Sequence, residues 1–222
     1  MRFTQSERLV FTGDSVTASG RDREDPMSLG EGYVRMIAEA LPASATVVNT
    51  GLDGNRARDL EARWTADVLG LAPSVVTVLI GINDTWRRYD RGLLSPVPEF
   101  EACLDRLLTG TLAPAPGERR GAPRLFVMTP FLLPVGPGQQ TWYEDLAPRT
   151  EAVVRTATAH GATVVRTDLA LSRAAGVHGA AALAPDGVHP SPLGHRVIAE
   201  AWLAAAEAAG TDGAAGIGQD RE

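Results

Sequence analysis

Short apolar runs recur along this chain, and the intervals between them are long enough for helices. Five runs are candidates for buried strands, at residues 8–12, 46–49, 75–80, 125–128 and 163–165. Runs that are apolar nearly throughout, without strict alternation with polar residues, are typical of parallel strands covered by helices on both faces. The pattern predicts an α/β fold: a three-layer α/β/α sandwich with a five-stranded parallel sheet.

The length and the C-terminal composition set the extent of this fold. We expect a single domain over residues 1–210, because 222 residues leave little room for a second core. Its last helix is predicted to begin at Ser191, a suitable N-cap, followed by Pro192 at the first helical position. The Gly- and Ala-rich residues 211–222 are expected to form a flexible tail. The composition of residues 131–143, rich in Pro, Gly and Gln, is typical of a long surface loop and makes them a candidate lid.

All 21 basic residues are arginine, so the chain contains no lysine. This absence excludes a Schiff-base lysine, a lysine general base and the lysine of a phosphate-binding loop. The net charge is −6 and the arginines are scattered along the sequence. We therefore expect no nucleic-acid partner.

The cysteine and histidine content argues against a metal site. The single cysteine, Cys103, cannot form an internal disulfide, and the four separated histidines give no zinc-ligand spacing. Cys103 falls in an apolar helical stripe and is expected in the core. We expect no metal and no cofactor. The first residues form no apolar leader, and no run approaches the roughly 18 apolar residues of a membrane helix. These two features predict a cytoplasmic protein without a membrane partner.

The most distinctive polar residues follow the predicted strands. Residues 13–17, 49–55 and 81–84 come directly after the first three strands, and residues 185–190 precede the last helix. The carboxyl ends of parallel strands meet at one edge of a sheet, and this edge is where such folds bind ligands. We expect the first three loops to converge there and the fourth to fold over them.

These loops contain the residue types that acyl transfer requires. A serine hydroxyl is a weak nucleophile until an imidazole accepts its proton, and the imidazole needs a partner that fixes its tautomer. We predict Ser15 as the nucleophile, His189 as the base and Asp186 as the orienting acid. An oxyanion also needs hydrogen-bond donors. Our candidates are the backbone amides of Ser15 and Gly54 and the side-chain amide of Asn83.

The chain resembles the SGNH hydrolases, also called GDSL-type esterases and lipases, in four blocks that occur in the family's order. The blocks are Gly13-Asp14-Ser15, the segment around Gly54, Gly81-Ile82-Asn83-Asp84 and Asp186-Gly187-Val188-His189-Pro190. The resemblance spans residues 10–202. It implies the flavodoxin-like sandwich of that family and a serine hydrolase mechanism.

Within this family the chain is most similar to the serine acetyl xylan esterases, through residues 54–64, 80–87 and 188–195. That similarity implies an enzyme, often intracellular and homo-oligomeric, whose small-molecule substrate is an acetyl ester on an oligosaccharide. Two positions depart from the branch: Ala18 stands where the relatives often have Asp, and Asp53 stands where they often have Ser. An added carboxylate at Asp53 would weaken catalysis or indicate a different substrate.

Other side chains near these blocks receive supporting roles. Asp14 is expected to tie down its loop by accepting backbone N–H groups. Trp86, Arg87 and Tyr89 are candidates for a sugar-binding wall, with packing against a neighbouring helix or subunit as the alternative. His195, in the first turn of the last helix, is interpreted as a packing or capping residue.

The sequence thus predicts a serine esterase that hydrolyses short acyl esters, acetyl first among them, through an acyl-serine intermediate. Another acyl hydrolase or acyltransferase of the family, such as a lysophospholipase or thioesterase, is the alternative. A carbohydrate-binding protein without catalytic activity is a further alternative. Such a protein, however, has no chemical reason to keep Ser15, Asn83, Asp186 and His189. Acyl chain length, leaving alcohol and oligomeric state stay open.

Overall fold

Five parallel strands form the centre of the molecule in the computed structural model, which describes residues 7–113 and 121–215. The sheet order is β2-β1-β3-β4-β5, and every neighbouring pair is parallel. The strands are β1 (Arg8–Gly13), β2 (Thr46–Asn49), β3 (Val75–Leu79), β4 (Arg124–Met128) and β5 (Thr163–Val165). Each lies within one residue of its predicted bounds, so the predicted fold class is confirmed.

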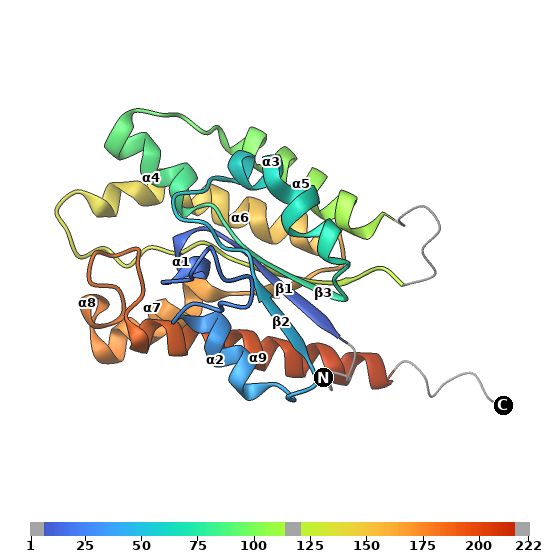
Figure 1. The fold of residues 1–222 in the computed structure, drawn as a ribbon. Coiled ribbons are helices and arrows are strands. Elements are labelled where there is room, and N and C mark those ends of the chain that lie inside the picture. Colours follow the sequence, from blue (N-terminus) through green and yellow to red (C-terminus); the bar gives the residue numbers. More distant parts are fainter. Residues whose placement is uncertain (1–6, 114–120, 216–222) are drawn as a thin grey trace.

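Helices cover both faces of the sheet (Figure 1). One face carries α3 (Ala57–Asp67), α5 (Val97–Leu112) and α6 (Tyr143–Ala159), and the other carries α2 (Tyr33–Ala40), α7 (Thr167–His178) and α9 (Pro192–Ala215). The shorter helices are α1 (Ser15–Ala18), α4 (Ile82–Arg91), α8 (Ala180–Leu183), η1 (Leu69–Leu71) and η2 (Gln139–Trp142). The three layers of the predicted sandwich are therefore present.

The sheet separates two apolar cores, because successive strand residues point to opposite faces. Phe11 packs with Trp202 of α9, their ring centroids 5.3 Å apart, whereas Val10 joins the core beneath α3 and α5. The Trp202 indole N–H donates to Thr77 Oγ1 on β3 at 3.1 Å, which satisfies its buried polar atom. Cys103 lies buried in the second core, and burial raises the pKa of its thiol to about 12, as expected for a packing residue.

The central strands β1 and β3 lie close together at their carboxyl ends. A side chain at Gly13 would stand 2.1 Å from the Leu79 carbonyl oxygen, so the closeness of the two strands requires glycine there. From β1 the chain continues to β2 on one side of this point, and from β3 it continues to β4 on the other side. The reversal of connection makes a crevice at the sheet edge, where open α/β folds bind ligands.

Two predictions about segments need revision. The surface loop predicted over residues 131–143 is wrong in its first part, because Phe131, Leu132 and Leu133 are buried and extend the apolar core beyond β4. Ser191 caps α9 as predicted, its Oγ accepting the Gly194 N–H at 3.2 Å. That helix continues to Ala215, inside the segment predicted as a tail, and residues 216–222 lie outside the described residues.

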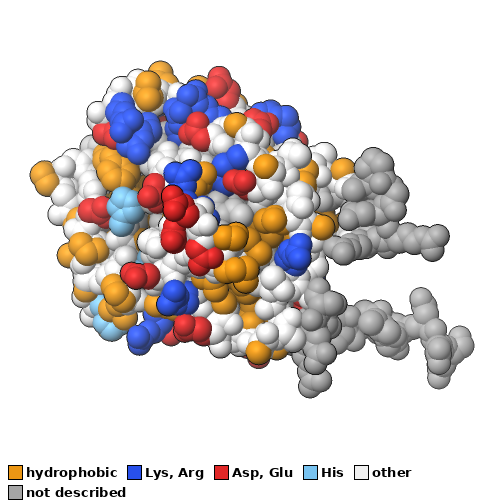
Figure 2. Space-filling view, viewed as in Figure 1, with side chains coloured by type: hydrophobic (Ala, Val, Ile, Leu, Met, Phe, Trp, Pro, Cys, Tyr) orange, Lys and Arg blue, Asp and Glu red, His pale blue; other side chains and the backbone are white. Residues whose placement is uncertain are grey.

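The surface carries both signs of charge. In the view of Figure 2, arginine and acidic side chains are interspersed, with apolar side chains between them. Within residues 7–113 and 121–215, no helix is both long and apolar enough to span a bilayer.

Candidate active site

Ser15 is the first residue of the short helix α1, directly after β1. Asp14 caps this helix, with its Oδ1 accepting the Val16 N–H at 3.0 Å. As the first helical residue, Ser15 has a backbone N–H without an intrahelical acceptor. Asp14 is buried, and its Oδ2 has no hydrogen-bond partner in the described part of the chain. Burial raises the pKa of Asp14 to about 7, although the Val16 N–H favours its ionised form.

A chain of hydrogen bonds connects three of the predicted residues. Ser15 Oγ lies 3.0 Å from His189 Nε2, and His189 Nδ1 lies 2.6 Å from Asp186 Oδ2. These distances are within hydrogen-bond range for proton transfer from serine to imidazole. The loop from residues 185–190 therefore does fold over the end of β1, as expected.

Asp186 is held by more than the imidazole. Its Oδ1 accepts the backbone N–H groups of Val188 at 2.9 Å and His189 at 2.7 Å. Partial burial disfavours the carboxylate, but the His189 side chain and these two N–H groups prevail and hold the pKa of Asp186 below its ordinary value. The acid is thus ionised and fixed in position beside the imidazole.

The segment of residues 131–143 stabilises the Asp186 loop through hydrogen bonds. Leu133 N–H donates to the Gly187 carbonyl at 2.8 Å, and Gln139 Nε2 donates to the Asp186 carbonyl at 2.7 Å. Gln139 Oε1 accepts the N–H groups of Val135 and Gly136, so one side chain joins both segments. Gly187 has φ +86°, a conformation that favours glycine.

Asn83 lies in the first turn of helix α4, where the sequence predicted a loop. Its Nδ2 donates to the Asn55 carbonyl at 3.1 Å, and its Oδ1 accepts from Arg87 at 3.4 Å. These two contacts fix which end of the amide carries the N–H groups, and they leave the second Nδ2 hydrogen available to a ligand. Gly54 lies in the loop after β2, the loop that also contains Asn55.

Asp84 joins the Gly54 loop to α4. This buried carboxylate accepts the Ala57 N–H at 3.0 Å, at the start of α3, and the Ser95 hydroxyl at 2.8 Å. Burial raises its pKa above the ordinary value, against the opposing effect of Arg149. The loops after β2 and β3 are therefore fixed relative to each other.

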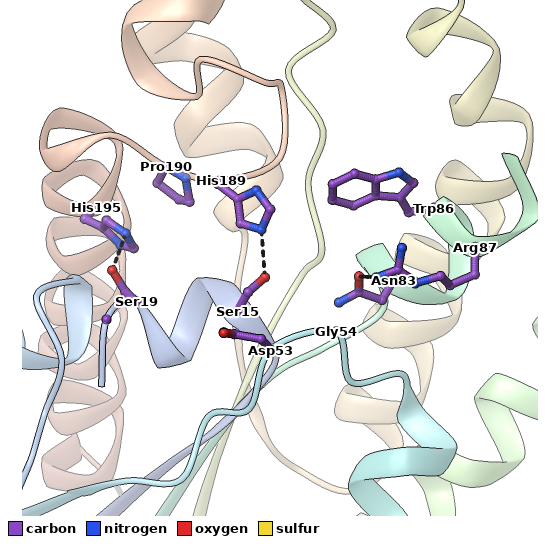
Figure 3. Close-up of a pocket in the computed structure, with 11 residues that line it drawn as sticks. Ser15, Ser19, Asp53, Gly54, Asn83, Trp86, Arg87, His189, Pro190 and His195 are labelled. Atoms are coloured by element: carbon purple, nitrogen blue, oxygen red, sulfur yellow. Dashed lines mark hydrogen bonds between the residues drawn. The ribbon is translucent and has the colours of Figure 1, made fainter. Parts of the chain in front are cut away.

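A cavity of about 520 Å³ brings these groups together (Figure 3). Ser15, His189, Gly54 and Asn83 all line it, and Asp186 lies behind His189. Since hydrolysis of an ester needs a nucleophile, a base and oxyanion donors around one reacting carbon, the arrangement suits acyl transfer.

The three candidate sugar contacts separate into two groups. Trp86 and Arg87 line the cavity, and the Trp86 ring centroid is 5.7 Å from that of His189. Tyr89 does not line it: its ring stacks on Trp142 at 5.5 Å, and its hydroxyl donates to the Thr141 carbonyl. Tyr89 therefore packs against a neighbouring segment, which was the alternative to a place in the sugar-binding wall.

The cavity also contains residues to which the sequence analysis gave no role there. Ser19 and His195 form its wall on the side of α1, and their side chains lie 3.0 Å apart. No local motif marks this pair, because its members are 176 positions apart. Asp53 also lines the cavity, whereas Ala18 is buried and does not.

Comparison with known proteins identifies a family that matches most of the chain and a relative of similar sequence. Residues 11–197 match the GDSL-like Lipase/Acylhydrolase family. An acetylxylan esterase of Geobacillus stearothermophilus is 35% identical over an alignment of 216 positions, which covers 91% of this chain and 95% of that protein.

Solved structures show the same similarity. The crystal structure of Axe2, an acetylxylan esterase of Geobacillus stearothermophilus, has a TM-score of 0.81 at 33% identity and covers 92% of this chain and 96% of its own. The structure of an α/β hydrolase enzyme from the metagenome of Lake Arreo, Spain, has a TM-score of 0.81 at 33% identity. It covers 92% of this chain and 97% of its own. Catalytic mutants of Axe2 with a serine, an aspartate or a histidine replaced by alanine match with a TM-score of 0.80.

Proposed function

Because the chain belongs to the GDSL-like lipase/acylhydrolase family and is a serine carboxylic ester hydrolase, we propose that it removes acetyl groups from the hydroxyls of a carbohydrate. The observation that carries this proposal is the hydrogen-bonded chain from Asp186 through His189 to Ser15, placed beside the Asn83 amide in one cavity. The catalytic mutants of Axe2 support it, since they alter the same three residue types.

Acylation begins at Ser15 in this mechanism. His189 Nε2 accepts the Oγ proton as Oγ attacks the ester carbonyl carbon, and Asp186 stabilises the imidazolium that forms. The carbonyl oxygen becomes an oxyanion, which the amides of Ser15, Gly54 and Asn83 stabilise. His189 then gives its proton to the leaving sugar oxygen as the carbon–oxygen bond breaks, which leaves an acetyl group on Ser15.

Water completes the cycle. His189 accepts a proton from a water molecule that attacks the acetyl-Ser15 carbonyl, and the same oxyanion donors act again. Collapse of the second intermediate returns the proton to Ser15 Oγ and releases acetate.

The lining of the cavity favours a small acyl group on a polar alcohol. Trp86 and Pro190 are the hydrophobic side chains of its wall, which provide no groove for a long acyl chain. Asp53 adds a carboxylate and Arg87 a guanidinium to the same wall, and both can form hydrogen bonds with the hydroxyls of a sugar. The acetylxylan esterases among the relatives support an acetylated oligosaccharide as the substrate.

Hydrolysis of a graded set of esters tests the proposal. We expect the protein to release acetate from acetylated xylo-oligosaccharides and to prefer p-nitrophenyl acetate to the butyrate and octanoate. Ser15→Ala, at a half-buried position, should keep the fold, measured by circular dichroism, and abolish both activities.

The outcomes separate the alternatives. If the protein preferred p-nitrophenyl octanoate, a lipid or thioester hydrolase would be the better description of its function. Turnover that survives Ser15→Ala would exclude Ser15 as the nucleophile, and absence of turnover on every ester would favour the carbohydrate-binding protein without catalytic activity.

A further inference from the structure

A second serine–histidine pair lies in the cavity beside the first, formed by Ser19 and His195 (Figure 3). Ser19 is the C-cap of α1, and His195 lies in the first turn of α9. Ser19 Oγ is 3.0 Å from His195 Nε2, the same separation as between Ser15 and His189. The two pairs nevertheless differ in whether the histidine Nε2 accepts a hydrogen bond from the serine hydroxyl or donates one to it.

The contact at the other ring nitrogen fixes the tautomer of His195. The Tyr33 backbone N–H donates to His195 Nδ1 at 3.2 Å, so Nδ1 must be an unprotonated acceptor. Neutral imidazole then has its hydrogen on Nε2 and donates it to Ser19 Oγ. Burial, together with the charge of His189, lowers the pKa of His195 to about 4, so the ring is neutral near pH 7.

This tautomer prevents His195 from acting as a base toward Ser19. The Ser19 oxygen accepts one hydrogen bond, and in the described part of the chain its own hydroxyl hydrogen has no protein acceptor. A hydroxyl held in this way can donate to an oxygen atom of a ligand in the cavity. The pair is suited to binding, whereas the Ser15–His189 pair is suited to catalysis.

Backbone geometry holds the pair in place. Ser19 has φ +37°, an uncommon conformation for a residue other than glycine, and its N–H is bound to the Ser15 carbonyl at 2.9 Å. A side chain at Gly32 would stand 2.6 Å from Ser19 Cβ and 2.7 Å from His195 Cε1. The absence of a side chain at Gly32 therefore permits the contact.

We propose that Ser19, oriented by His195, donates a hydrogen bond to an oxygen of the sugar that carries the ester. Figure 3 places the pair on the opposite side of Ser15 from Asn83. The Asn83 side receives the ester carbonyl oxygen, and an acetyl methyl group has no acceptor to offer Ser19. The hydroxyl-rich leaving group is the part of the substrate that does. This subsite rests on the proposed function.

Comparison of two substrates tests the subsite. Ser19→Ala should lower kcat/KM for an acetylated xylo-oligosaccharide about ten-fold, the usual effect of one lost hydrogen bond. It should change kcat/KM for p-nitrophenyl acetate less than two-fold, since that leaving group has no sugar oxygen. Ser172→Ala, at an exposed serine of α7 outside the cavity, is the matched control and should change neither value.

An equal loss on both substrates, or no loss on either, would overturn the subsite while leaving the esterase proposal intact. A wild-type protein that cleaves p-nitrophenyl acetate through Ser15 but no sugar acetate would overturn the carbohydrate function and this subsite with it. Long-range ¹H–¹⁵N spectra of His195 provide a second test, in which a hydrogen on Nδ1 at pH 7 would contradict the proposed orientation.

Discussion

At the scale of single residues, Asp186 illustrates how one carboxylate fixes an imidazole. Its Oδ1 is bound to two backbone N–H groups of the same turn, and its Oδ2 is bound to His189 Nδ1. The carboxylate cannot rotate without losing one of these contacts. The His189 ring is consequently held with Nε2 toward Ser15.

Asp186→Asn should reduce kcat by about 10³–10⁴, with a small change in KM. The Asn side chain can present N–H to Nδ1, which would favour the tautomer with hydrogen on Nε2 and remove the acceptor for the Ser15 proton. Initial rates with p-nitrophenyl acetate measure the effect, and circular dichroism verifies the fold. A rate near that of the wild-type protein would mean that another group orients His189.

The polar segments after β1 to β3 and the loop before α9 were sufficient to predict that Ser15, Asn83 and His189 lie near one another. They were insufficient for Ser19 and His195, because a contact across 176 positions leaves no periodic or local pattern. Gly32 was a weak signal, because a glycine before a helix has many explanations, and the resemblance at His195 did not indicate its partner. The tautomer of His195 depends on the Tyr33 N–H, a contact that only the three-dimensional structure reveals.

At the scale of elements, the segment of residues 131–143 is a support for the Asp186 loop. Its first three residues are buried, and Gln139 binds both the segment itself and the Asp186 carbonyl. Pro and Gly favour turns in both mobile and tightly hydrogen-bonded loops, so composition could not distinguish the two. The apolar run at residues 131–133 was the stronger signal.

Gln139→Ala should lower kcat for p-nitrophenyl acetate about three- to ten-fold, because the Asp186 loop loses a hydrogen bond and the turn at residues 135–136 loses its acceptor. The adjacent Gln140→Ala, an exposed side chain, is the control and should leave kcat unchanged. Equal kcat values for the two variants would contradict the supporting role of Gln139.

At the scale of the whole molecule, two buried groups couple folding to pH in opposite directions. His195 has a pKa of about 4 in the folded state against an ordinary value of 6.5, so its contribution to the free energy of unfolding decreases as pH falls from 6.5 to 4. Asp14 has a pKa of about 7 against 3.8, so its contribution decreases as pH rises through that interval. The two effects partly cancel in the wild-type protein.

Single substitutions should expose each effect. Relative to the wild-type protein, the free energy of unfolding of Asp14→Asn should rise by about 2–3 kcal/mol from pH 4.5 to pH 7, and that of His195→Gln should fall by about as much. Urea unfolding at the two pH values measures both. Differences that do not change with pH would show that neither group titrates as described.

The distance in sequence between Ser15 and His189, 174 positions, has a consequence for biosynthesis. The nucleophile lies directly after β1, at the start of α1, whereas its proposed base is synthesised later, with the segment that leads into α9. A nascent chain can form β1 to β3 early, yet it holds an unactivated serine until the C-terminal helix packs against α2. Recovery of esterase activity during refolding would therefore report the docking of the His189 loop onto the end of β1, and a chain that stalls in translation before His189 would be catalytically silent.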